Sequence, residues 1–349
     1  MNTSFDPNAP AAVDSGIYGL PFTESDATVV LVPVPWEVTT SYGGGTAHGP
    51  RAILEASRQV DLYDLDVEKP YLPGIFMLPE DERVGSWNEE GRKLASVIID
   101  AGGVVDGPDA AAALARVNEL SGKLNAFVHA ETERLLRAGK IVGIVGGDHS
   151  VPLGAIEVVA QSRPNGIGVL HFDAHSDTRQ AYEGFTFSHA SIMHNVLERV
   201  ANVKKLVQVG IRDVCEDEIE YCKSQGDRVS VFFDRTISRR KMMGESFASI
   251  AREMVAALPN DVWISFDIDG LDPRFCPHTG TPVPGGIDYA EAVFVMGEVV
   301  RAGKTIVGFD LNEVAPGPEG DEWDGNVGAR LLYKLIGFTL ASQGKAKLL

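Results

Sequence analysis

The chain has 349 residues, of which 44% are hydrophobic and 23% charged, so it can bury one large core or two small ones. Its formal charge of -18 argues against nucleic-acid binding, which needs basic patches, and favours small cationic partners. Because the sequence has neither an apolar run of about 18 residues nor the basic and apolar blocks of a signal peptide, we expect no membrane partner and a cytoplasmic location.

The first third of the chain contains few regular patterns. Residues 1–25 are rich in Pro, Ala, Asp and Ser, and we expect an N-terminal extension that lies over the surface or exchanges with a neighbouring subunit. The apolar run at 29–33 predicts a buried strand, and a helix should follow at 51–57. Residues 63–110 contain several prolines and acidic patches, and we expect an irregular surface segment with one strand at 74–78.

Helices and strands alternate in the remainder of the chain. Apolar residues at helical spacing predict helices at 118–139, 151–161, 191–200, 247–257, 289–302 and 327–342. Short apolar runs between them predict strands at 140–145, 166–172, 205–209, 229–233, 262–266 and 305–311. This alternation is typical of the α/β class, in which helices cover both faces of a mostly parallel sheet. Since no linker divides the chain, we predict a single domain over residues 26–349.

The most informative stretch follows the predicted strand at 166–172. It places Asp173, His175 and Asp177 at alternate positions, and an extended chain directs such positions to one side. Two carboxylates and an imidazole crowded at the end of a buried strand would be poorly solvated unless a cation lay between them. We therefore predict a metal site, and the alternative is a solvated turn that happens to be rich in aspartate.

Similar clusters follow three other predicted strands, and ligands of parallel sheets bind at the carboxyl edge where such clusters meet. The candidate donors are His149, Asp173, His175, Asp177, Asp267 and Asp269. Six donors are too many for one tetrahedral zinc ion and suit two ions that share carboxylates. Four carboxylates carry about -4, which two divalent ions balance. A nitrogen and oxygen donor set without thiolate suits Mn, Ni, Co or Fe.

Three motifs resemble the signature motifs of the ureohydrolase family, which includes arginases and agmatinases. They are Gly146-Gly-Asp-His-Ser150, Asp173-Ala-His-Ser-Asp177 and Ser265-Phe-Asp-Ile-Asp-Gly-Leu-Asp-Pro273. The resemblance extends from about Thr28 to the C-terminus. It implies a three-layer α/β/α sandwich of the arginase type, a homotrimer or homohexamer, and hydrolysis of a small guanidinium compound to release urea.

The resemblance also implies a role for individual residues. His149, Asp173, Asp177 and Asp267 would bind or bridge one ion, and His175 and Asp269 would complete the shell of the second. Three residues would act in catalysis: Asp177 would relay a proton to the departing nitrogen, His189 would pass protons to solvent, and Glu313 would hold the guanidinium. The other histidines, His48, His129, His171, His194 and His278, have no such support and are expected to be structural.

The substrate prediction depends on the segment between Asp177 and His189. Arginases place small Asn, Ser and Thr residues there, whereas this chain has bulky and charged ones, so arginine is not expected. This segment, the stretch at 35–42 and the tail after Glu313 resemble an agmatinase-like branch that includes nickel-dependent guanidine hydrolases. Trp36 or Trp323 would cap a free guanidinium ion by a cation–π contact.

We therefore expect hydrolysis of guanidine to urea and ammonium, with two divalent ions that are Ni²⁺ in a guanidine hydrolase and Mn²⁺ in an agmatinase-like enzyme. The first alternative is agmatinase activity, for which Glu183 would bind the distal ammonium of agmatine. The second is guanidinobutyrase activity, which an acidic site mouth disfavours. Two alternatives of other functional classes are a deacetylase-like enzyme with one metal ion and a non-catalytic metal-binding homologue. The number of metal ions bound per chain distinguishes them from a hydrolase with two ions.

Overall fold

The computed structural model describes residues 5–318 and 320–349, and its centre is an eight-stranded sheet with strand order β3-β1-β4-β9-β8-β5-β6-β7. All neighbouring strands in this sheet are parallel. The strands are β1 (Val29–Val34), β3 (Ile75–Met77), β4 (Ile141–Gly146), β5 (Ile167–Phe172), β6 (Val203–Val209), β7 (Val229–Phe232), β8 (Asp261–Asp267) and β9 (Thr305–Asn312). A separate antiparallel pair joins β2 (Val67–Glu68) to β10 (Lys347–Leu348).

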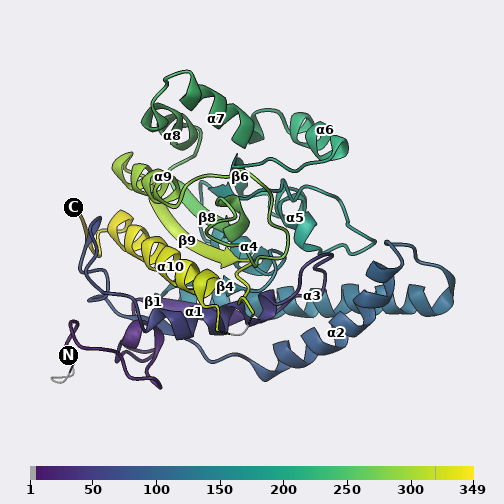
Figure 1. The fold of residues 1–349 in the computed structure, drawn as a ribbon, viewed down its shortest axis with the longest axis horizontal. Helices are drawn as coiled ribbons and strands as arrows, with labels where there is room; N and C mark the ends of the chain where they lie inside the picture. The colour runs from purple at the N-terminus through teal and green to yellow at the C-terminus, as the bar shows by residue number, and fades with distance from the viewer. Residues whose placement is uncertain (1–4, 319) are drawn as a thin grey trace.

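Helices cover both faces of the sheet, which confirms the predicted three-layer α/β/α sandwich (Figure 1). One layer contains α1 (Gly49–Ser57), α7 (Asp234–Met242), α8 (Phe247–Ala256), α9 (Tyr289–Arg301) and α10 (Trp323–Ser342). The other contains α2 (Glu82–Asp100), α3 (Gly107–Arg137), α4 (Leu153–Gln161), α5 (Ile192–Arg199) and α6 (Glu216–Ser224). None of the described helices is long and apolar enough to cross a membrane.

The strands are apolar because both of their faces are buried. Along β1, Val29 and Leu31 enter the core beneath α1 and α10, whereas Val30 and Val32 enter the core beneath α3 and α4. Successive side chains of a strand point to opposite faces, so one continuous apolar run contributes to two cores.

Within 63–110 the strand predicted at 74–78 is confirmed by β3, but the prediction that the segment is otherwise irregular is wrong, because it contains all of α2 and the beginning of α3. The Asp81 side chain caps α2 by accepting the Arg83 N–H at 2.8 Å, and Val84, Ala95 and Ile98 are buried on one face of the helix. These apolar positions are separated by many charged residues, which hid the helical pattern. In Figure 1 the hairpin of α2 and α3 extends to the side of the sheet. Helices α6 and α7 were also not predicted.

The predicted N-terminal extension is partly built into the core. Residues 1–4 lie outside the described part, but Ile17, Tyr18 and Leu20 are buried against α1 and α10. The Tyr18 hydroxyl donates to the Ala329 carbonyl at 2.9 Å, and its N–H donates to Ser57 Oγ at 2.9 Å. This part of the extension therefore belongs to the packed domain and does not simply lie over its surface.

Candidate metal centre

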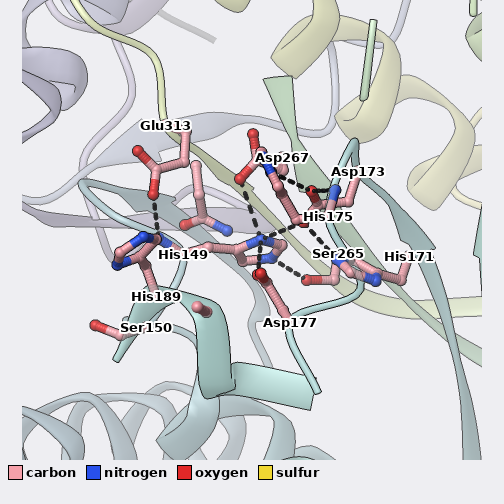
Figure 2. A network of polar contacts seen from close by, with 12 residues as sticks. His149, Ser150, His171, Asp173, His175, Asp177, His189, Ser265, Asp267 and Glu313 are labelled. Carbon is pink, nitrogen blue, oxygen red and sulfur yellow. Dashed lines mark hydrogen bonds and ion pairs between the residues drawn. The ribbon is translucent and has the colours of Figure 1, made fainter. Parts of the chain in front are cut away.

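Four adjacent strands of the sheet carry the candidate residues at their carboxyl ends. Strand β4 leads to His149, β5 to Asp173, His175 and Asp177, β8 to Asp267 and Asp269, and β9 to Glu313. Because β4, β9, β8 and β5 are neighbours in that order, the clusters that the sequence places far apart meet at one edge. Figure 2 shows the side chains of Asp173, Asp177 and Asp267 converging on the imidazole of His149.

Three carboxylates surround one nitrogen of His149 (Figure 2). Its Nδ1 lies 3.1 Å from Asp173 Oδ2, 3.3 Å from Asp267 Oδ2 and 3.4 Å from Asp177 Oδ2. One ring nitrogen has at most one hydrogen to donate, so this group contains more acceptors than donors. A cation bound among these four atoms would correct the imbalance.

A second group of donors lies beside the first and shares Asp173 with it. His175 Nδ1 is 3.1 Å from Asp269 Oδ2 and 3.5 Å from Asp173 Oδ1. Asp173 therefore directs Oδ2 toward the group around His149 and Oδ1 toward the group around His175. Two donor groups joined by a carboxylate are the arrangement that a pair of divalent ions requires.

The charges of the site also fit bound cations. The four aspartates are buried, and within residues 5–318 and 320–349 none of their carboxylates forms an ion pair with lysine or arginine. Buried carboxylates that only histidines compensate are costly unless a metal ion neutralises them. By this test, the residues present fit two divalent ions held by nitrogen and oxygen ligands.

Without metal ions, the site retains protons. Burial and the charge of Asp173 raise the pKa of Asp177 to about 8. Burial, Asp269 and Asp173 likewise raise the pKa of Asp267 well above its usual value. Burial would lower the pKa of His175, but the carboxylates of Asp269 and Asp173 outweigh it and raise this pKa to about 12. At neutral pH these groups are therefore protonated in the metal-free protein.

We expect metal binding at neutral pH to release protons, because ligands bind metal in their deprotonated form. The affinity for Mn²⁺ should therefore increase as the pH rises. The raised pKa of Asp177 also means that the metal-free native state holds more protons than the unfolded chain. Its contribution makes the metal-free protein less stable as the pH rises from about 4, the unfolded value, to about 8.

Isothermal titration calorimetry with Mn²⁺ in two buffers of different ionisation enthalpy measures the released protons. The observed binding enthalpy should differ between the buffers. An identical enthalpy in both buffers would contradict the protonated state of the empty site.

Four residues that support the candidate ligands had no predicted role in the site: His171, Gln208, Ser265 and Asp310. His171, expected to be only structural, has Nε2 2.8 Å from Asp173 Oδ2, and its Nδ1 faces Gln208 Nε2 at 3.1 Å. Because the Gln208 amide donates to Nδ1, the ring hydrogen is on Nε2 and is donated to Asp173. Ser265 Oγ lies 2.9 Å from His149 Nε2 and donates to Asp310 Oδ1 at 2.8 Å. These contacts orient the candidate ligands, as groups behind a metal site commonly do.

Glu313 is buried next to the cluster in a strained backbone conformation. Its φ is 62°, in the left-handed region. Its N–H donates to the Gly147 carbonyl at 2.8 Å, and its own carbonyl accepts the Thr279 hydroxyl at 2.8 Å. Its Oε1 accepts the His149 N–H at 3.0 Å, which fixes the carboxylate beside the candidate ligand (Figure 2).

A cavity of about 270 Å³ opens over part of the cluster. Its wall includes His175, Asp177 and His189, together with Arg179, Tyr182, Asp213, Glu218 and Tyr42 among others. Burial and the nearby His175 lower the pKa of His189 to about 4, so its imidazole is neutral at neutral pH. This arrangement lets a small molecule approach the candidate metal ligands from solvent beside a neutral histidine.

The two predicted tryptophans do not form part of this cavity wall. Trp36 is fully buried in the core beneath α2 and α3, and its position is set by apolar packing. Trp323 is half exposed at the start of α10, and its indole N–H donates to the Arg274 carbonyl at 2.9 Å. The prediction that either one caps the cavity must therefore be corrected. Glu183 also lies outside the wall, beside Gly103 in the turn between α2 and α3.

Known proteins of the arginase family resemble this chain in both sequence and fold. The model of the arginase family matches residues 27–337. An N(1)-aminopropylagmatine ureohydrolase of Synechocystis is 30% identical, with 92% of each chain covered. An agmatinase of Klebsiella pneumoniae is 31% identical over 92% of this chain and 90% of its own. In fold, the chain resembles the proclavaminate amidino hydrolase of Streptomyces clavuligerus, with a TM-score of 0.71, 23% identity, and coverage of 96% and 99%.

Proposed function

The chain belongs to the arginase family of metal-dependent amidinohydrolases, and we propose that it hydrolyses a C–N bond of a small guanidinium cation, with free guanidine as its substrate. The observation that carries this proposal is the cavity that joins His175, Asp177 and His189 above the carboxylate cluster. Urea and ammonium would be the products. The relatives named for ureohydrolase and agmatinase activities support the reaction type but not this substrate.

The six residues predicted as metal ligands would hold two divalent ions at this site. When bound, these ions would make water a strong nucleophile at neutral pH. We propose nickel if the substrate is guanidine and manganese if it is agmatine. We also propose a homotrimeric or homohexameric assembly in the cytoplasm, as the family resemblance implies.

The residues of the chain would orient the substrate and move its protons. Guanidinium resists attack because its charge and double bond are spread over three nitrogens, so a fixed orientation is required. The buried carboxylate of Glu313 would bind two N–H groups through charge-assisted hydrogen bonds. Asp177 would give a proton to the departing nitrogen, and the neutral imidazole of His189 would exchange protons with solvent.

Agmatine is the second candidate, because one wall of the cavity offers an acid for its distal ammonium. Asp213 is exposed on that wall, and within the described residues its carboxylate has no ion pair with lysine, arginine or histidine. The agmatinase relatives also support this alternative. Free guanidine has no tail and needs no such partner.

Urea release from guanidine, agmatine, 4-guanidinobutanoate and arginine tests the proposal, with the protein loaded with Ni²⁺ or Mn²⁺. We expect guanidine to have the highest kcat/KM and to yield urea and ammonium. Putrescine formation from agmatine at a far higher kcat/KM would overturn the substrate choice. The absence of urea from all four compounds would overturn the reaction itself.

A further inference from the structure

Arg179 is a cationic side chain on the wall of the cavity above the candidate metal ligands. It follows Asp177 by two positions, and its backbone N–H donates to the Ala190 carbonyl at 3.2 Å. Among the described residues that line this cavity, it is the only lysine or arginine. A guanidinium group is charged at every physiological pH, so this part of the wall is permanently positive.

The Arg179 guanidinium is held between an aromatic ring and a fixed carboxylate. Its central carbon lies 4.9 Å from the centre of the Tyr182 ring, and its Nε lies 3.6 Å from Glu218 Oε2. Glu218 itself is buried and accepts the N–H groups of Thr178 and Cys215, each at 3.1 Å. Arg179 therefore has a rigid support on two sides, while 36% of its side chain remains exposed.

This arrangement occupies the groups that would otherwise attract a second cation. Arg179 already covers one face of Tyr182 and already pairs with Glu218, so that face of the ring and that carboxylate are occupied by a cation of the chain itself. Asp213 is the remaining carboxylate among the lining residues outside the candidate metal ligands. A guanidino compound with a cationic tail would thus meet a fixed positive charge near Asp177.

We infer that Arg179 is a charge filter that determines substrate specificity. It disfavours guanidino compounds with a distal ammonium, such as agmatine, and admits guanidine and compounds whose distal group is neutral or anionic. This inference rests on the proposed hydrolysis of guanidinium compounds. It also changes the expectation for 4-guanidinobutanoate, because its carboxylate meets Arg179 as well as the acids at the cavity mouth.

Steady-state kinetics of Arg179→Gln test the filter. We expect kcat/KM for agmatine to rise about tenfold relative to that for guanidine, as removal of one nearby like charge in a partly solvated site predicts. The kcat/KM for 4-guanidinobutanoate should fall relative to that for guanidine. Arg179→Lys keeps the charge but not the planar contact with Tyr182, so it should keep agmatine as a poor substrate.

The exposed Arg51 on α1 provides a matched control, since among the described residues it pairs only with Glu55 on its own helix. Arg51→Gln should leave both kcat/KM ratios unchanged. If Arg179→Gln changed kcat/KM by the same factor for guanidine, agmatine and 4-guanidinobutanoate, the charge filter would be overturned and the proposed reaction would remain intact. A wild-type preference for agmatine that Asp213→Asn abolishes would also overturn the filter, because the ammonium would then bind Asp213. If the wild type released no urea from any substrate, the proposed function would fail, and the filter with it.

Discussion

Glu313→Gln is expected to bind metal ions as the wild type does and to hydrolyse guanidine about 10²–10³ times less efficiently. The loss of one partner from a buried, hydrogen-bonded charge pair typically costs about 3–4 kcal/mol, which corresponds to this factor in kcat/KM. Glutamine has nearly the same shape, and its oxygen can still accept the His149 N–H. The variant would therefore remove the negative charge proposed to face the guanidinium, while it keeps the contact that positions the side chain.

Metal content and kcat/KM should be measured together on this variant. Glu55→Gln is a suitable control, because Glu55 is an exposed residue of α1 that pairs only with Arg51 within the described chain. If Glu313→Gln kept wild-type turnover at full metal content, Glu313 would have no part in holding the substrate.

Asp173→Asn is expected to lose most of the bound metal and to reduce urea release by at least about 10³-fold. Asp173 is the residue that both donor groups share, since Oδ2 faces His149 and Oδ1 faces His175. An amide offers one neutral oxygen where the two ions would require two anionic ones. Elemental analysis after gel filtration measures the metal content, and circular dichroism verifies the fold.

His171→Gln provides a graded comparison for Asp173→Asn. His171 supports Asp173 from behind, and loss of such a contact typically weakens metal affinity by about 10–100-fold without abolishing binding. A variant Asp173→Asn that kept two ions per chain would show that Asp173 is not a shared ligand. If His171→Gln lost as much bound metal as Asp173→Asn, His171 would itself be a metal ligand.

The sheet and the location of the site were predictable from the sequence for a simple reason. Apolar runs of strand length alternate with helical patterns from residue 118 onward, and each of the four central strands is followed directly by polar residues. Parallel strands bring their carboxyl ends to one edge, so the alternation predicts that Asp173, His149, Asp267 and Glu313 share that edge, and the strand order of the structure then makes them neighbours. The spacing of Asp173, His175 and Asp177 then indicates the chemistry.

The residues behind and around the site were not predictable, because their contacts depend on how distant elements meet. His171 precedes Asp173 by two positions on the same side of the chain, but the Gln208 contact that fixes the hydrogen on its Nε2 depends on the pairing of β5 with β6. Arg179 is held by Glu218, which is fixed at the start of α6, a helix that the sequence pattern did not indicate. Trp36 looked suitable for a cap by its position in the chain, but apolar packing draws it into the core. The left-handed backbone of Glu313 also has no signal in residue type, whereas aspartate, as at position 177, adopts this conformation more often than most residues.

Two metal ions in one cluster are proposed to support hydrolysis of a guanidinium compound. Titration of the metal-free protein with Ni²⁺, and separately with Mn²⁺, while urea release from guanidine is recorded, tests this proposal most directly. We expect activity to rise until two equivalents per chain are bound and then to remain constant. Activity that is complete at one equivalent, or urea that fails to form at any metal concentration, would contradict this account.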